Sequence, residues 1–491
     1  MTTQPTPPIE LLGTGTHLRA NRVEVSSEVR ATLRAVCELI DAPAHVAEVS
    51  RDWWPLAMHW ALAGDVPSTA GVVCRPASAE EISRVLAVAN DARLPVTPAG
   101  GRSGVCGASV PVHGGILLDL TGMHGVVGLD DTSLVAEVLP GTFGSDYQYA
   151  LDERGLTGGH WPQSMDISTV GGWLACRGAG QYSTRYGKIE DMVVGVEVVL
   201  ADGSVIRTGG APRAAAGPDL TQLFVGAEGT LGVISRAWLR VRPTPPEERR
   251  AAFSFDTFEA GLDACRRILR RGATPAVLRL YDGPESARSH GGDGSACVLL
   301  VLDEGDPLVI DATMAAVFDE CGGARPADVG LVERWKQHRN DTSALQALTR
   351  KGFVVDTMEI AGPWSALPAI FDATRAALLA VPHARAATCH LSHSYTDGAC
   401  LYFTFAATPP PDAIESTYVA MWDAGTRAVL GAGGNLSHHH GIGLNRDRFM
   451  AEALGPSLGV LQAVKSALDP HGILNPGKLG LSSPFGWAEW P

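Results

Sequence analysis

The sequence has little of what marks a nucleic-acid binder or a small secreted scaffold. Its 491 residues carry a net charge of −14 at pH 7, whereas general nucleic-acid binders neutralise phosphates with an excess of Lys and Arg. It has only nine cysteines, an odd number, scattered and without a CxxC pair. This usage predicts free thiols in a reducing compartment, not a disulfide framework.

The sequence also lacks the hydrophobic segments of a transmembrane helix or a signal peptide. No uncharged apolar run reaches the length needed to span a bilayer. The N-terminus, MTTQPTPPIE, has neither the basic region nor the apolar run of a signal peptide. We therefore expect a soluble cytoplasmic protein without a transmembrane segment.

A chain of this length should fold as two or three domains. The cluster Pro243-Thr244-Pro245-Pro246 is the strongest boundary signal, because prolines punctuate regular structure. We predict an N-terminal tail and helical segment over residues 1–70 and a ligand-binding domain over 71–245. A second domain should cover 246–430, and a C-terminal segment should cover 431–491.

Local patterns predict several helices before that boundary. One should run from Ser27 to about Leu39. Another should begin after Ser78, with Glu81 three residues later in a capping-box arrangement. A third should begin at Gly141.

The stretch from Gly158 to Asp191 is dense in Gly, Ser and Thr, yet it carries Trp161, Trp173 and Tyr182. Ordinary linkers have the small residues without the aromatic ones. Small side chains let a backbone approach a bound group closely, and long structureless loops are uncommon in compact domains unless they bind something. We interpret the stretch as a ligand-binding segment; the alternative is a long surface loop.

A second glycine-rich segment follows the predicted strand Pro95–Pro98. Glycines at 100, 101, 104 and 107 let consecutive N–H groups point into one concavity, which suits a pyrophosphate. The segment is neither a Walker loop nor a dinucleotide GxGxxG motif.

Four motifs in order, the GGxxGxxG loop, STVGG, RYGKIEDMVVGVEVVLADG and GAEGTLGVI, resemble the FAD-binding domain of the vanillyl-alcohol oxidase / p-cresol methylhydroxylase (PCMH-type) flavoproteins. The resemblance covers roughly Gly71 to Arg242 and implies FAD as cofactor. It assigns cofactor contacts to Pro98, Gly100, Gly101, Arg102, Ser103, Gly104, Gly107, Ser164, Asp166, Ser168, Thr169, Gly172, Arg177, Gly178, Glu228, Gly232, Ile234 and Asn475. Some relatives hold flavin covalently through a His in the phosphate loop. This loop has none, so we expect non-covalent FAD, with a thioether through Cys106 left open.

Beyond Pro246, predicted strands and helices alternate in a pattern that suits an antiparallel sheet covered by helices. The predicted fold class is therefore α+β: a two-subdomain FAD-binding domain plus an α+β cap domain over the flavin.

Three adjacent histidines, His438, His439 and His440, stand in the C-terminal part. Imidazole is a common metal ligand. Adjacent residues on an extended chain point to opposite faces, however, so three in a row seldom bind one ion. We expect no metal and predict an electropositive, hydrogen-bonding wall against a substrate.

Together with the segments 363–364, 388–389 and 397–403, this run resembles one branch of the family, the alkyldihydroxyacetonephosphate synthases, which exchange an acyl for an alkyl group on FAD without net redox change. The resemblance implies Tyr402 as base, with the three histidines lining the site. It also implies that His160 faces the flavin, that Arg279 supports substrate binding, and a homodimer. His390 stands where the branch has an Arg for the substrate phosphate, and an imidazole holds a phosphate less well than a guanidinium.

Three functions remain open. The preferred one is an FAD-dependent oxidoreductase that takes hydride from a carbon bearing a hydroxyl, on a small or lipid-like substrate, to the flavin N5. Tyr402 or a His would take the hydroxyl proton, with neighbouring imidazolium lowering the pKa of the phenol. The alternatives are the ether-lipid synthase itself and a flavin-fold protein without turnover. Metal-dependent 2-hydroxy-acid dehydrogenases carry a second His at position 402 and a Glu at 439, which disfavours that class here.

Overall fold

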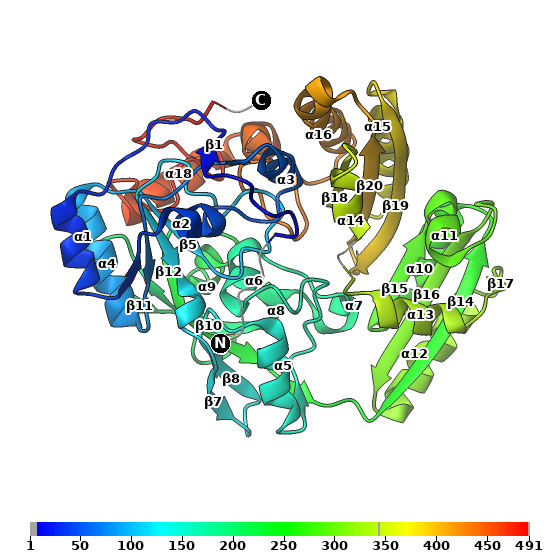
Figure 1. The fold of residues 1–491 in the computed structure, drawn as a ribbon. Helices are drawn as coiled ribbons and strands as arrows, with labels where there is room; N and C mark the ends of the chain where they lie inside the picture. The colour runs from blue at the N-terminus through cyan, green and yellow to red at the C-terminus, as the bar shows by residue number, and fades with distance from the viewer. Residues whose placement is uncertain (1–6, 342–343, 490–491) are drawn as a thin grey trace.

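The computed structural model describes residues 7–341 and 344–489 and arranges them in two parts that share one large cavity (Figure 1). The first part contains a four-stranded and a five-stranded sheet, and the second is built on a seven-stranded sheet. This mixture of helix and sheet, with a large antiparallel sheet in the second part, confirms the predicted α+β class.

The four-stranded sheet has the order β2-β4-β6-β5. β4, β6 and β5 pair in parallel, and β2 joins the edge in the antiparallel sense. The predicted helix over 27–39 is too long, because Leu39 and Ile40 are extended and pair with β4. The elements of this region are β1 (Gly15–Thr16), α1 (Ser27–Arg34), β2 (Glu38–Ile40), α2 (Pro43–Val49), α3 (Pro55–Leu62), β3 (Asp65–Val66), β4 (Val72–Arg75), α4 (Ala79–Ala92), β5 (Val96–Ala99), β6 (Ile116–Asp119) and η1 (Leu120–Gly122).

Helix α4 shows why the sequence pattern around it was informative. Ser78 Oγ accepts the N–H of Glu81 at 3.3 Å, as an N-cap does. Glu81 reaches back to the N–H of Ala77, one residue before the cap. The apolar face of the helix, including Ile82 and Leu86, is fully buried against the sheet.

The five-stranded sheet is antiparallel, in the order β11-β10-β12-β8-β7. The third predicted helix begins at Gly144, not Gly141, because Phe143 is extended and forms its N-cap. The elements are β7 (Val126–Asp130), β8 (Val135–Val138), α5 (Gly144–Asp152), β9 (Leu156–Thr157), α6 (Val170–Cys176), α7 (Ser183–Tyr186), α8 (Ile189–Met192), β10 (Val193–Val199), β11 (Val205–Arg207), α9 (Thr221–Phe224), β12 (Val233–Arg240) and β13 (Arg242–Pro243).

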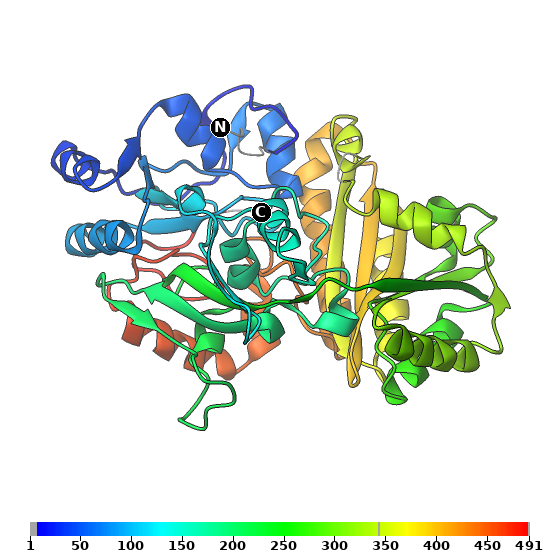
Figure 2. The ribbon, with the colours of Figure 1, turned by 90° about the horizontal axis from the view of Figure 1, so that it is seen from below.

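After β13 the chain enters the seven-stranded sheet, whose order is β17-β14-β16-β15-β19-β20-β18 and whose pairs are antiparallel. Its long strands run beside the first part in the second view (Figure 2). The elements are β14 (Glu247–Phe255), α10 (Phe258–Arg270), β15 (Val277–Tyr281), α11 (Gly283–His290), β16 (Cys297–Gly305), α12 (Pro307–Glu320), β17 (Arg325–Pro326), α13 (Gly330–His338), α14 (Ala344–Thr349), β18 (Val354–Pro363), α15 (Leu367–Ala380), β19 (Ala384–Ser394), β20 (Gly398–Ala407), η2 (Pro411–Ala413) and α16 (Ile414–Gly431).

The last residues return to the first part. After α16 a loop crosses the cavity, followed by η3 (Asp447–Phe449), α17 (Met450–Leu454) and α18 (Ser457–Leu468). Leu474 then forms a parallel bridge with Val96, and the N–H of Asn475 donates to Val96. The C-terminal segment therefore joins the four-stranded sheet, although it is far from it in sequence. None of the described helices is long and apolar enough to cross a membrane.

Candidate active site

One cavity of about 990 Å³ lies between the two parts of the molecule. Its first wall consists of the glycine loop after β5, the segment before and along α6, and the turn before β12. Its second wall consists of strands β15, β19 and β20 of the seven-stranded sheet and the histidine run after α16. Segments far apart in the sequence thus face the same space.

The glycine loop is built so that two backbones run in contact. A Cβ on Gly100 would clash with Thr169 Oγ1, and a Cβ on Gly101 would clash with the carbonyl of Ile167. Thr169 in turn caps α6 by accepting the N–H of Gly172 at 3.3 Å. The result is a concave wall of small residues and a helix N-terminus, a donor set that fits a cofactor with a pyrophosphate.

Most residues assigned to the cofactor by resemblance line this cavity. They are Pro98, Gly100, Gly101, Arg102, Ser103, Gly104, Ser164, Ser168, Thr169, Gly172, Gly178, Glu228, Gly232 and Ile234. Cys106 also lines it, and burial raises the pKa of its thiol well above the usual value.

Four of the assigned cofactor residues lie behind the wall. Gly107 has φ +78° and packs on Trp54 and Leu444. Asp166 accepts a hydrogen bond from Ser145. The other two residues brace neighbouring segments: Arg177 caps the end of α6 and donates to Gln222 at 3.1 Å, and Asn475 donates to the carbonyls of Ala108 and Glu228. These four residues are not part of the cavity lining.

His160, which the resemblance places facing the flavin, is not among the residues that line the cavity. Its side chain is buried with a ring-centroid distance of 4.6 Å to Trp173. Burial, with nearby Lys188, lowers the pKa of His160 to about 3, so the ring is neutral.

The histidine run is held by a buried carboxylate that sequence reasoning did not single out. Glu359 on β18 is fully buried and accepts the backbone N–H groups of His438, His439 and His440 at 3.2, 3.1 and 2.8 Å. Burial alone would raise the pKa of Glu359, but the Arg446 guanidinium and His440 hold it well below its usual range. A permanent negative charge therefore fixes this backbone.

Two further contacts tie the run to the first part. Lys188 Nζ donates to the carbonyl of His438 at 2.6 Å. Glu228, on the cofactor wall, accepts the N–H groups of Ile442 and Gly443 at 2.5 and 2.9 Å. The loop therefore connects the two parts of the molecule across the cavity.

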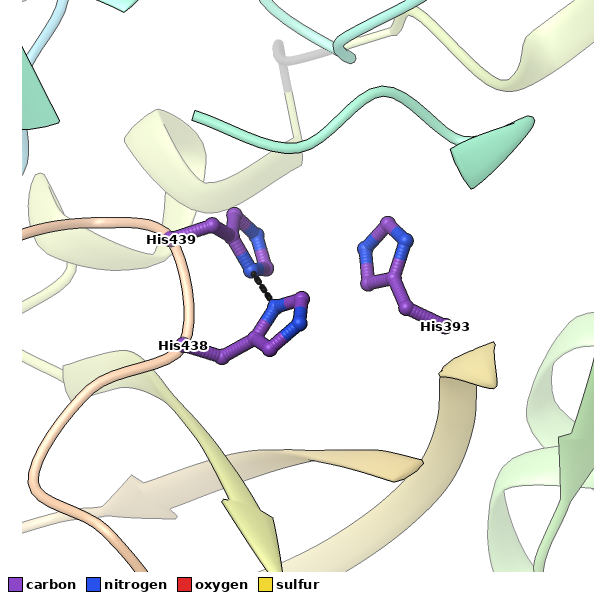
Figure 3. Close-up of side chains that lie close together, drawn as sticks. All are labelled: His393, His438 and His439. Atoms are coloured by element: carbon purple, nitrogen blue, oxygen red, sulfur yellow. Dashed lines mark hydrogen bonds between the residues drawn. The ribbon is translucent and has the colours of Figure 1, made fainter. Parts of the chain in front are cut away.

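The rings of His438 and His439 converge on His393 of β19 (Figure 3). The two adjacent Nδ1 atoms are 2.9 Å apart, and His393 Nδ1 is 2.6 Å from Ser183 Oγ. The expectation that neighbours in this run point to opposite faces is wrong here, because the backbone curls around Glu359 and is not an extended strand. Ring nitrogens of the three histidines lie within 4.8 Å of one another.

His438 and His439 do not make the wall electropositive, contrary to the expectation from the sequence. Burial and the Lys188 charge hold the pKa of His438 well below its usual value. Burial and His440 do the same for the pKa of His439. Both rings are therefore neutral at pH 7 and can accept a proton.

Tyr402 on β20 lines the cavity, with its ring centroid 6.0 Å from that of His439. Its hydroxyl donates to Thr357 Oγ1 at 3.0 Å. Burial raises the pKa of Tyr402, and Glu359 and Asp356 raise it further. The expected lowering of the Tyr402 pKa is therefore wrong, because burial and the Glu359 and Asp356 carboxylates outweigh the lowering by the Thr357 hydrogen bond and the Arg279 charge.

His390 stacks on Tyr402 at 4.9 Å and contacts Arg279 through Nε2 at 2.6 Å. Its Nδ1 faces Glu285 Oε1 of α11 at 2.8 Å. Burial and the Arg279 charge lower the pKa of His390 to about 4. The ring is thus neutral and supplies no charge in place of the missing Arg.

Glu359, His393, Tyr395 and Glu285 were missed as site residues. Glu359 offered a signal: with Asp356 it is an acid inside an otherwise apolar strand, which is unusual unless the acid has a buried partner. The others become visible only when β19, α11 and the histidine run are brought together.

Comparison with known proteins agrees with this geometry. Residues 70–209 match the model of the FAD binding domain, and residues 244–479 match that of the FAD linked oxidases, C-terminal domain. The FAD-linked oxidoreductase YgcU of Escherichia coli (strain K12) is 32% identical over 437 residues, covering 84% of this chain and 89% of that protein.

Other relatives differ in their named activity. Alkyldihydroxyacetonephosphate synthase of Dictyostelium discoideum is 29% identical over 455 residues, covering 85% of this chain and 74% of that protein. Glycolate oxidase subunit GlcD of Bacillus subtilis (strain 168) is 29% identical over 426 residues, covering 83% of this chain and 88% of that protein.

Solved structures share the fold. An alkyldihydroxyacetonephosphate synthase matches with a TM-score of 0.78 at 24% identity, covering 96% of this chain and 90% of its own. p-Cresol methylhydroxylase matches with a TM-score of 0.74 at 17% identity, covering 94% of this chain and 99% of its own. The predicted flavoprotein fold and FAD as cofactor are confirmed, and the chain belongs to the family of FAD-linked oxidases and is an FAD-dependent oxidoreductase.

Proposed function

We propose that this enzyme oxidises a CH–OH group on a small substrate that carries a negative charge. The observation that carries the proposal is a pair of neutral, buried imidazoles, His438 and His439, one of which lines the cavity beside Tyr402. A neutral imidazole has a free ring nitrogen that can accept a hydroxyl proton, and its lowered pKa means that the ring passes this proton on and does not keep it. His439 is the proposed base, and Tyr402 is a hydrogen-bond donor.

The cofactor would be held by the glycine cradle, Thr169 and Glu228 on the first wall. When bound, FAD supplies the two-electron acceptor for the carbon-bound hydrogen. The chain's own residues hold the substrate, exclude water and take the hydroxyl proton. Because burial keeps the thiol of Cys106 protonated, we propose that the flavin is bound without a covalent link.

The proposed charge of the substrate rests on the cations of the second wall. Four arginines line the cavity from three elements: Arg279 on β15, Arg288 on α11, and Arg334 and Arg339 on and at the end of α13. Arg339 lies over three aromatic rings, including that of Trp335 at 5.8 Å, and its Nη1 has no hydrogen-bond partner in the described part of the chain. Several guanidinium groups in one region of the cavity lining suit the binding of a carboxylate.

The site is proposed to work without a metal. The Nδ1 atoms of His438 and His439 face each other at 2.9 Å, the distance of a hydrogen bond, so the two rings can bind each other without an ion. Outside the site, residues 71–245 are proposed as the FAD-binding domain, 246–430 as the cap and 431–491 as the closing segment. All nine cysteines are free, which favours a reducing compartment such as the cytoplasm.

The second candidate is the exchange reaction of alkyldihydroxyacetonephosphate synthase, an enzyme of ether-lipid synthesis. It is favoured by apolar residues in the cavity lining, among them Met58, Val355 and Phe405, which would suit a long chain. The neutral His390, held against Glu285, counts against it, since a phosphate dianion would meet a carboxylate there.

An anaerobic titration of the oxidised enzyme, followed by flavin absorbance, separates the two candidates. The panel contains glycolate, D-lactate, p-cresol and acyl-dihydroxyacetone phosphate. We expect a hydroxy acid to bleach the flavin band, and the colour to stay bleached until an electron acceptor is added. Bleaching by the acyl phosphate that a fatty alcohol reverses without oxygen would establish the synthase instead. If no compound bleaches the flavin, the proposed function is wrong.

A further inference from the structure

A second, smaller cavity of about 410 Å³ lies behind the histidine run. His438 and Tyr395 form its inner side, and Lys188, Glu190 and Asp191 contribute its charged side. Asp191 and Asn435 at its rim are exposed, so the cavity is reached from the surface. Oxidation chemistry in the first cavity does not require this space.

A continuous set of short contacts connects the two cavities. His439 lines the first cavity, and its Nδ1 is 2.9 Å from Nδ1 of His438 (Figure 3). His438 Nε2 is 2.9 Å from the hydroxyl of Tyr395, which lines the second cavity. Three side chains thus bridge the wall with two hydrogen bonds of ordinary length.

We propose that His439, His438 and Tyr395 form a proton relay that carries the substrate's hydroxyl proton from the catalytic cavity to the second cavity and so to solvent. The proposal rests on the proposed function, because it needs a proton released in the first cavity. It adds a role for Tyr395 and for a cavity on the far side of the catalytic wall.

The reaction balances with one proton to export. In the oxidation of a secondary alcohol to a ketone, bound FAD would supply the acceptor for the carbon-bound hydrogen and its electron pair. The hydroxyl loses its proton as the C=O bond forms. That proton must leave the base before the next turnover. At the start, His439 carries its proton on Nδ1 and His438 carries its proton on Nε2. The Nδ1–H of His439 then donates to Nδ1 of His438, and the Nε2–H of His438 donates to the hydroxyl of Tyr395. His439 then takes the new proton on Nε2, and each carrier passes on the one it held.

The groups around the relay favour proton transfer in which neither His438 nor His439 stays positively charged. Lys188 lies against His438, donates to its carbonyl and pairs with Glu190 at 3.0 Å. Its positive charge disfavours an imidazolium on His438. The carboxylates of Glu190 and Asp191, in contrast, lie at the second cavity and favour the arrival of a proton there.

The test compares Tyr395→Phe, which removes only the last hydroxyl of the relay, with Tyr186→Phe. Tyr186 is a buried tyrosine whose hydroxyl donates to Glu304, outside both cavities. The holoenzyme is mixed anaerobically with the compound of the panel that bleaches its flavin, in weak buffer with a pH-indicator dye. We expect Tyr395→Phe to slow flavin reduction and proton release together by about tenfold or more. Its solvent deuterium isotope effect should also rise. Tyr186→Phe should match the wild type. Wild-type rates of both events in Tyr395→Phe would overturn the relay.

A measurement without substrate keeps the relay separate from the proposed function. In the ¹⁵N spectrum of histidine-labelled holoenzyme, we expect one of the two facing Nδ1 atoms to be protonated and the other bare. Tyr395→Phe should shift the His438 Nε2 resonance and leave that of His160 in place. Two bare Nδ1 atoms, or an unchanged His438 resonance, would overturn the relay. If no compound of the panel bleaches the flavin, the proposed function fails, and this spectrum still decides whether the three side chains are hydrogen-bonded in the order that the relay requires.

Discussion

Replacing Glu359 by Gln tests how the histidine run is held in place. Glu359 and Arg446 form an ion pair in which both side chains are fully buried, and the same carboxylate accepts three backbone N–H groups. Gln keeps the volume and one acceptor oxygen but removes the charge, which leaves the Arg446 guanidinium without its counter-ion. Breaking a buried pair in this way costs about 3–5 kcal/mol.

The matched control is Glu452→Gln. Glu452 pairs with Arg427 at 2.7 Å, but their side chains are 45% and 56% exposed. Such a surface pair contributes about 1 kcal/mol or less. At about 2–4 °C per kcal/mol for a domain of this size, Glu359→Gln should lower the melting temperature by at least about 6 °C. Glu452→Gln should lower it by only about 2–4 °C at most.

The pH dependence of melting supplies a second check. Because the folded-state pKa of Glu359 lies below its unfolded value, its contribution is fully present above the unfolded pKa and is lost as the pH falls through the folded pKa. The melting difference between wild type and Glu359→Gln should therefore be constant between about pH 6 and 8 and narrow in acid. The reasoning would be refuted if Glu359→Gln melted at the same temperature as Glu452→Gln. It would also be refuted if the difference in melting temperature between wild type and Glu359→Gln increased in acid.

Three further outcomes are expected. Gly100→Ala should lower the flavin content of the purified protein, since a Cβ there clashes with a neighbouring hydroxyl, whereas Gly459→Ala, which meets nothing within 4 Å, should leave the 450 nm absorbance per protein unchanged. His390→Arg should strengthen the binding of inorganic phosphate, which is measured through the change it causes in the flavin spectrum. Equal affinity in the variant and the wild type would show that this position does not contact the anion. EDTA should leave the rate of flavin bleaching unchanged and added Zn²⁺ should slow it by binding His438 and His439. A rate lost on chelation would contradict the metal-free site.

The sequence by itself determined the parts of the protein whose chemistry is local. The glycine loop, the Thr169 cap and the turn at Glu228 depend on small residues and capping side chains at short spacing, so their motifs predicted a cofactor wall and the FAD-binding fold. The alternation of strands and helices beyond Pro246 similarly predicted the helix-covered antiparallel sheet. The helix beginning at Ser27 was predicted too long, because pairing with β4 overrides the local preference after Arg34.

The tertiary structure alone decided the electrostatics of the catalytic wall. His438 and His439 converge because Glu359, on a strand distant in sequence, holds their backbone in a curl. Tyr402 keeps its proton and the histidines lose theirs because burial and the sign of the nearby charges set their pKa values. Neither burial nor the neighbours of a side chain across the sheet can be obtained from spacing along the chain, so the sequence named these groups while their protonation had to come from the fold.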